Sequence, residues 1–286
     1  MKYFYKLCLG YLFTPSLYAA IILFFLLCLF GATVNVNSES YSVFDLLMNH
    51  SLLNEAKTDF SCNSYFMLRN FSGSVWFIVA LPVISGYPAL TVYSNYCEPS
   101  RIMILSRTSK KSYSTAVILS SFFSGMVIAI SGILLYSITI YLVFPEITSF
   151  DVDFLQSINL DNWTGRIADF FPRASNCVIV SGLLSVITVI IFCFIRDKFM
   201  SLSLPMMLMY VSMKLSMLYS SWIAEDTSRY NDKALEAVYI VFLSSAADIH
   251  YYMQSCFNIP YILYFLFTAV ILLIFIHIFK GIGTKV

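Results

Sequence analysis

The long apolar stretches of this chain constrain its fold more than any other feature. Six segments are long and apolar enough to cross a hydrocarbon layer about 30 Å thick, which takes about 20 residues of helix. They cover residues 17–34, 73–93, 114–144, 176–195, 201–223 and 261–279. They lack the strict alternation of barrel strands, and lipid offers no partner to an open backbone. The sequence therefore predicts an all-α polytopic membrane protein, with six transmembrane helices in a single domain, 1–286.

The composition excludes a soluble enzyme domain and a disordered chain. Of the 286 residues, 59% are hydrophobic and only 12% are charged, against about 45–50% and about 25% in soluble domains. A domain of this size has too little interior to hide that excess. The basic residues also form no large patch interleaved with aromatic residues, so no nucleic-acid partner is expected.

Lysine and arginine are divided unequally between the two sides of the predicted bundle. The segments on one side hold ten of them and two acids, and they are 1–16, 94–113, 196–200 and 280–286. The segments on the other side hold six and fourteen acids, and they are 35–72, 145–175 and 224–260. The positive-inside rule puts both termini in the cytoplasm. Short loops and a Ser/Ile/Tyr-rich composition favour a bacterial cytoplasmic membrane.

Three further features lie outside the apolar runs. Residues 1–16 are expected to form an N-terminal interfacial helix, with a disordered tail as the alternative. Ala234–Ala247 is too short to span and predicts a re-entrant or interfacial helix before the last span. Cys62 and Cys256 fall in two exterior segments, where they either pair or stay as free thiols.

The segment 94–113 carries the main functional signal. Glu98, Pro99 and Ser100 suit the first turn of a helix, and Arg107 follows toward its C-terminal side with Lys110 and Lys111. A short amphipathic helix between two spans, exposed to the cytosol, suits docking onto a partner protein. The alternative is that these cations only fix the topology and bind anionic headgroups.

A family resemblance begins at Arg107-Thr-Ser-Lys-Lys-Ser-Tyr113, which precedes a long apolar run with Ser120, Ser121, Ser124 and Gly125. This stretch resembles the permease subunits of type-2 ABC transporters, in which a similar R-x-S-R/K-K-x-Y stretch follows the second span. There it forms a coupling helix that touches the ATPase subunit. The resemblance implies an exporter of peptide, lipid or hydrophobic drug with a separate ABC ATPase and a second permease subunit. The ATPase-coupling residues would be Glu98, Arg101, Arg107, Ser109, Lys110 and Lys111.

The chain itself is not expected to be an enzyme. It lacks a G-x-x-x-x-G-K-[ST] sequence, so ATP and Mg²⁺ are expected on the partner ATPase. No catalytic motif and no metal-ligand spacing is found either. Two other functions stay open: a membrane immunity or sensor protein that binds a peptide through its exterior loops, and a secondary transporter.

Two patterns inside the apolar runs are also informative. Lys214 is a costly charge near the middle of the fifth run, with Tyr210 and Ser221 on about the same face. These three residues are a candidate cargo pathway, although Lys214 could instead snorkel or pair with a neighbouring helix. Ser121, Gly125 and Ala129 repeat every four residues and permit close helix approach, within the chain or between two copies.

Overall fold

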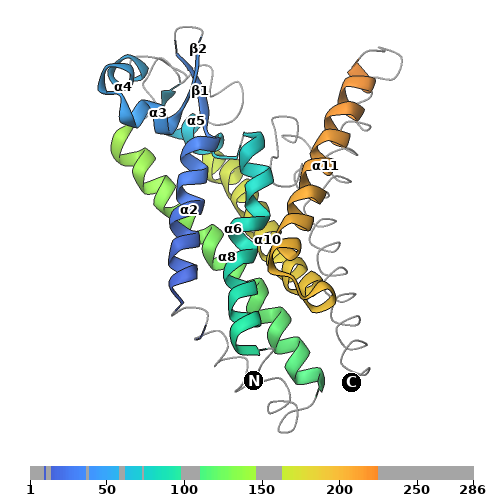
Figure 1. The fold of residues 1–286 in the computed structure, drawn as a ribbon. Helices are drawn as coiled ribbons and strands as arrows, with labels where there is room; N and C mark the ends of the chain where they lie inside the picture. Colours follow the sequence, from blue (N-terminus) through green and yellow to red (C-terminus); the bar gives the residue numbers. More distant parts are fainter. Residues whose placement is uncertain are drawn as a thin grey trace.

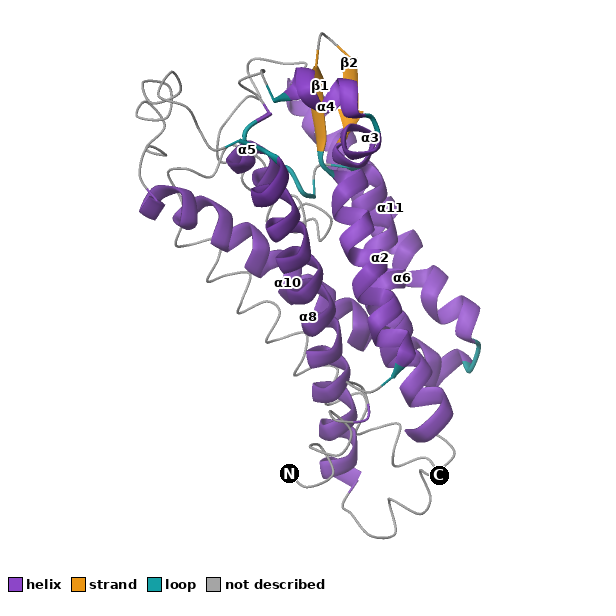
Figure 2. Ribbon diagram, turned by 90° about the vertical axis from the view of Figure 1, so that its left-hand side faces the viewer, coloured by secondary structure: helices purple, strands orange, loops and turns teal. Residues whose placement is uncertain are grey.

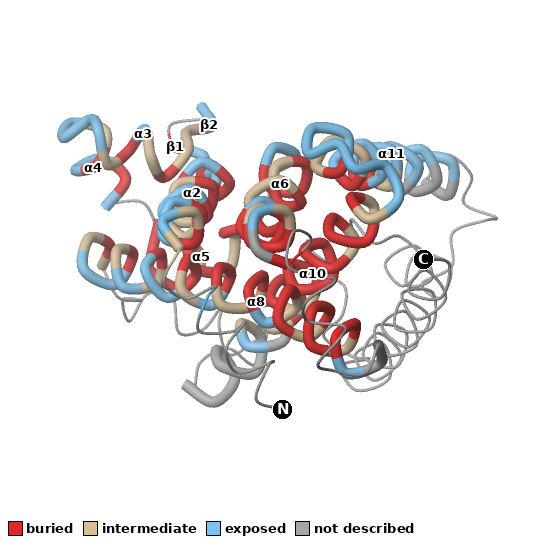
Figure 3. Tube along the Cα trace, turned by 60° about the horizontal axis from the view of Figure 1, so that its bottom comes forward, coloured by how far each residue is buried: buried red, intermediate tan, exposed pale blue. Residues whose placement is uncertain are grey.

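A computed structural model describes residues 10, 14–36, 39–57, 62–72, 74–97, 110–145 and 163–224. Five helices form an elongated bundle with a small cap at one end (Figure 1): α2 (Pro15–Gly31), α6 (Val75–Val92), α8 (Lys110–Val143), α10 (Trp163–Ile195) and α11 (Lys198–Ala224). Helix α10 packs most extensively against α8 and α6, α2 packs on α8 and α6, and α11 packs on α6 and α10. Figure 3 shows that the buried residues gather on α10 and on the sides of α6 and α8 that face it.

Among the described residues, three helices are long and apolar enough to cross a membrane: Val75–Asn95, Ser112–Val143 and Arg173–Ile195. They confirm the expected runs 73–93, 114–144 and 176–195 as long apolar helices, and they indicate an integral membrane protein. Helix α8 has 34 residues, which is about 50 Å of helix and more than one crossing needs. The fifth run, expected over 201–223, forms α11, while the sixth run lies outside the described residues together with 234–247 and Cys256.

The first apolar run is not helical to its end, so the expectation of a helix over 17–34 is corrected. Helix α2 has 17 residues and ends at Gly31, and strand β1 (Thr33–Val36) follows. Along β1, Val34 and Val36 are buried while Thr33 and Asn35 are exposed, which is the period of two that belongs to a strand. A Cβ on Gly31 would meet the Phe71 carbonyl oxygen at 2.8 Å, so the chain turns here through a crowded site.

The expectation of an all-α fold is therefore wrong in one detail. Strand β1 pairs with β2 (Glu39–Ser42) in an antiparallel hairpin, with Thr33 opposite Ser42 and Val36 opposite Glu39. Three short helices follow: α3 (Val43–Met48), α4 (His50–Ala56) and α5 (Ser64–Arg69). We call the hairpin and these three helices the cap, and Figure 2 shows them together at one end of the bundle.

Capping side chains define the short helices of the cap. The Ser42 hydroxyl accepts a hydrogen bond from the Asp45 backbone N–H at 3.1 Å, and the Asp45 carboxylate accepts from the Ser42 N–H at 3.1 Å. This capping box satisfies donors that a helix N-terminus leaves open. The Asn49 side chain caps α4 by accepting from the Ser51 N–H, and the Asn63 side chain caps α5 by accepting from the Phe66 N–H.

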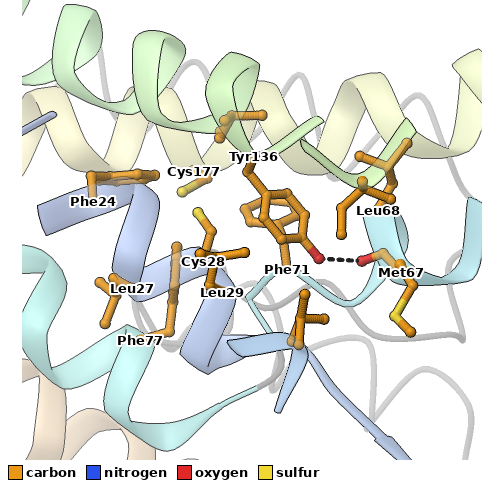
Figure 4. Packing of buried hydrophobic residues seen from close by; sticks show 14 of the residues in the cluster. Phe24, Leu27, Cys28, Leu29, Met67, Leu68, Phe71, Phe77, Tyr136 and Cys177 are labelled. Atoms are coloured by element: carbon orange, nitrogen blue, oxygen red, sulfur yellow. Dashed lines mark hydrogen bonds between the residues drawn. The ribbon is translucent and has the colours of Figure 1, made fainter. Parts of the chain in front are cut away.

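The cap is joined to the bundle through buried contacts (Figure 4). The Tyr136 hydroxyl on α8 donates to the Met67 carbonyl on α5 at 2.7 Å, and the Ser64 N–H donates to the Pro145 carbonyl at 3.0 Å. Edge-to-face ring pairs link Phe24 to Phe77 and Phe77 to Phe71, with centroids 5.7 and 5.8 Å apart. A pair of this kind adds about 0.5–1.5 kcal/mol beyond the area that it buries.

Candidate functional site

The predicted coupling segment is bounded more narrowly than expected. After α6, a π-helical turn η2 covers Tyr93–Cys97, and α8 begins at Lys110. Lys110 and Lys111 thus belong to α8 and are continuous with the expected third span. The rest of the predicted coupling segment is residues 98–109. Glu98, Arg101, Arg107 and Ser109 are among them and lie outside the described residues.

One buried hydrogen bond joins the two ends of this segment. The Tyr113 hydroxyl donates to the Cys97 carbonyl oxygen at 3.1 Å across 16 residues of sequence. The residues are 4% and 1% exposed, so water competes little for the bond. We call this bond the clasp, because it holds the end of η2 against α8.

A compact apolar cluster lies beneath the clasp, and we call it the coupling cluster. Its buried members come from η2 and the ends of three helices: Ala89, Leu90, Val92, Tyr93, Cys97, Tyr113, Ala116, Val117, Ile118, Val186, Val189, Ile190 and Phe192. The Tyr93 ring packs edge-on against Phe192 with centroids 6.1 Å apart. The Cys193 thiol donates to the Tyr93 hydroxyl at 3.3 Å. The base of the coupling segment is therefore shared by α6, α8 and α10.

Small polar residues continue this contact into the centre of the bundle, along a line that we call the serine seam. The Ser185 hydroxyl on α10 donates to the Ser85 carbonyl on α6 at 2.7 Å, and the Ser181 hydroxyl donates to the Gly125 carbonyl on α8 at 3.0 Å. Pro88 has no N–H, so it leaves the carbonyl of Ile84 without its helix donor, and the Ser85 carbonyl that accepts from Ser185 is the next one along. A hydroxyl from a neighbouring helix is a usual way to satisfy backbone near such a proline in a membrane.

Glycines let the three helices approach closely along the seam. A Cβ on Gly86 would lie 2.4 Å from Thr188 Oγ1, and a Cβ on Gly125 would lie 2.5 Å from the Ser181 carbonyl oxygen. Ser121, Gly125 and Ala129 are all buried in the bundle. The structure thus assigns Gly125 to packing within the chain, one of the two alternatives that the four-residue repeat left open.

The three candidate cargo residues share one exposed face of α11. The Lys214 ammonium lies 5.8 Å from the centre of the Tyr210 ring, within range of a cation–π attraction. The Ser221 hydroxyl donates to the Leu218 carbonyl at 2.9 Å. Met209 and Met213 are the buried side of the same helix. The three exposed residues lie away from the side of α11 that packs on the bundle, and they stay a candidate cargo pathway.

The sequence did not single out the clasp or the seam. In the sequence Tyr113 is only the last residue of a motif, and its partner is a backbone carbonyl at the end of the π-helical turn. Ser181, Ser185 and Thr188 lie at helical spacing within a strongly apolar run, which is the available signal for a polar contact between helices.

In the described part of the chain, no group of three or more His, Cys, Asp or Glu side chains could hold a metal ion. No known protein family, curated protein or solved structure is matched by this chain.

Proposed function

We propose that this chain is the permease subunit of an ATP-driven type-2 ABC transporter that exports peptide, lipid or hydrophobic drug. The observation that carries the proposal is the clasp. Tyr113 ends the stretch that resembles the family's coupling motif, and its hydroxyl ties the end of η2 to α8. Because the clasp joins the two ends of this segment, a force applied to the segment is transmitted to α6 and α8.

The proposed topology has six spans with both termini in the cytoplasm. Helices α6, α8 and α10 supply the second, third and fourth spans, α2 and α11 supply the first and fifth, and 261–279 supplies the sixth. The cap then lies outside the cell. The support for this arrangement is the segregation of lysine and arginine, which concentrates cations at the clasp end of the bundle.

The mechanism follows from the contacts at the clasp end. ATP and Mg²⁺ bind the partner ATPase, whose closure displaces residues 98–109 in a rigid-body movement. The clasp and the coupling cluster carry that displacement into α6, α8 and α10, and the serine seam keeps these helices in register. Two permease subunits would enclose the pathway, with Lys214, Tyr210 and Ser221 as candidate cargo contacts.

The test is purification of the full chain from its native membrane, followed by ATPase measurement in lipid nanodiscs. We expect a stoichiometric ABC ATPase to copurify, and we expect Arg107→Glu, Lys110→Glu and Lys111→Glu together to release it. Tyr113→Phe removes only the clasp hydroxyl, so it should lower ATP hydrolysis while the ATPase stays bound.

The matched control is Tyr87→Phe, since Tyr87 is 48% exposed on the same helix α6 that leads into η2. It should leave ATP hydrolysis unchanged. A chain that purifies alone, or a complex indifferent to all three charge reversals, would contradict the proposed function.

A further inference from the structure

Two cysteines from different helices meet inside the bundle near the cap. Cys28 lies on α2 and Cys177 lies on α10, and both are free thiols with 0% exposure. Figure 4 shows the two sulfur atoms pointing toward one another. The thiols are near enough for a charge on one to act on the other. Cysteines that only fill a core as small hydrophobes need no such arrangement, so the pair is a candidate for joint chemistry.

The surroundings of the two thiols are apolar. Phe24 and Phe77 belong to the same buried cluster and lie beside the pair. Tyr136 is also near, but its hydroxyl donates to the Met67 carbonyl at 2.7 Å and is directed to the cap. A monovalent metal ion held by two thiolates would leave a net charge among these side chains, whereas a disulfide is neutral. The surroundings therefore favour a disulfide as the product of the pair.

The pair lies close to the end of the bundle that carries the cap. Cys28 is three residues before Gly31, where α2 ends, and Cys177 is four residues after Arg173, where the apolar span of α10 begins. Each thiol is therefore about 5–6 Å along the helix axis from the end of its apolar stretch. In the proposed topology this end faces the exterior, where disulfides persist more readily than in the cytoplasm. The meeting of the two thiols depends neither on that topology nor on the transporter function.

We propose that Cys28 and Cys177 are a redox site, at which a small membrane-permeant disulfide oxidises the two thiols to a disulfide bond between α2 and α10. One thiol, as its thiolate, attacks a sulfur of the oxidant and releases half of it as a thiol. The second cysteine then attacks the protein sulfur of this mixed disulfide and releases the other half. Two protons and two electrons pass from the protein to the oxidant, which is reduced to two thiols. Because α2 and α10 each pack on other helices of the bundle, the new bond fastens the first helix directly to the fourth.

The experiment treats the reduced full chain in detergent with dipyridyl disulfide, an apolar oxidant. A joined pair of cysteines releases both halves of the oxidant and keeps no pyridylthio group, whereas an isolated cysteine releases one half and keeps the other. Mass spectrometry of unreduced peptides identifies which cysteines are joined. We expect a slow reaction, because neither thiol is exposed, and a cross-link between Cys28 and Cys177 that dithiothreitol reverses. The cross-link should raise Tm, because it restrains the unfolded chain.

Three variants complete the experiment. Cys28→Ala and Cys177→Ala should each abolish the cross-link and the rise in Tm that the oxidant produces. Cys193→Ala is the matched control, since Cys193 lies on the same helix α10 and its thiol donates to the Tyr93 hydroxyl instead; it should keep both effects. Separate pyridylthio groups on Cys28 and Cys177 in the unmutated chain would overturn the proposal. A link from either one to another cysteine, or two thiols that stay unreacted, would overturn it as well.

Discussion

Adding one methyl group at Gly86 or at Gly125 tests the packing of α10 against its two neighbours. The three atoms nearest to a Cβ on Gly86 all belong to the Thr188 side chain, at 2.4, 2.9 and 3.1 Å. Around Gly125 they are Ser185 Oγ at 2.3 Å, the Ser181 carbonyl oxygen at 2.5 Å and Gly182 Cα at 2.9 Å. The first methyl meets a side chain, whereas the second also meets the backbone.

Both alanine substitutions should destabilise the bundle. Overpacking costs about 1–3 kcal/mol, and contacts this short favour the upper end. Replacing a helical glycine by alanine returns about 1 kcal/mol of helix propensity. The net loss of unfolding free energy is therefore about 2 kcal/mol for Gly86→Ala and at least as much for Gly125→Ala, whose backbone neighbours cannot rotate away.

A second substitution distinguishes the two sites. Thr188→Ala removes the atoms at 2.4 and 3.1 Å, so Gly86→Ala with Thr188→Ala should recover stability through a coupling of about 1–2 kcal/mol. Ser185→Ala removes only one of the three atoms near Gly125 and also removes the hydrogen bond to Ser85, so that pair should show no recovery.

The assay is unfolding by sodium dodecyl sulfate in mixed micelles, followed by circular dichroism. Gly10→Ala is the control, because a Cβ on Gly10 meets no described atom within 4 Å. Recovery in both double variants, or in neither, would refute the distinction between side-chain and backbone contacts across these helices.

Two further outcomes concern the cap. Tyr136→Phe leaves the buried Met67 carbonyl without its donor, which should lower the free energy of unfolding by about 1–3 kcal/mol and speed hydrogen exchange in α5. Tyr210→Phe, on the exposed face of α11, should change neither quantity. An unchanged exchange rate in Tyr136→Phe would be inconsistent with that bond. Tyr41 donates to Glu39, and this hydrogen bond raises the pKa of the Tyr41 phenol above its ordinary value of 10.0. A raised pKa means that the stabilisation is complete below pH 10.0 and is lost as the pH rises through the folded-state pKa. Glu39→Gln should therefore lower the pKa seen by ultraviolet absorbance titration, and an unmoved titration would contradict the assignment.

Hydropathy predicted the second, third and fourth helices well, because the free energy of transfer from water to an apolar phase adds up over every residue of a long run. It failed at residues 32–34, where the run stays apolar although the backbone leaves α2 and enters β1. The alternation of Thr33, Val34, Asn35 and Val36 was a visible signal, but four residues are too few to outweigh the preceding helix. The hairpin also needs β2 as the partner of β1, and nothing in the local sequence of either strand indicates that the two pair.

The candidate site was predictable in position but not in its contacts. The charges and the motif indicated 94–113, and the structure shows that α8 takes the last four of these residues. A partner 16 residues away decides the role of Tyr113, and packing on α10 decides that of Gly125. Contacts of this kind arise from the tertiary arrangement, so a single sequence reveals the residue types and leaves their partners open.

Helix α8 connects the two ends of the molecule, and its two buried tyrosines show how. Tyr113 donates to the Cys97 carbonyl at the clasp, and Tyr136 donates to the Met67 carbonyl in the cap. The two tyrosines are 23 positions apart, which is about 35 Å of helix. Both bonds are buried and both acceptors are backbone atoms, so each end of this stretch of α8 is held to a neighbouring backbone through one packed tyrosine side chain. Helix α8 therefore joins the clasp end of the bundle to the cap, and α10 holds it laterally through the hydrogen bond from Ser181 to the Gly125 carbonyl.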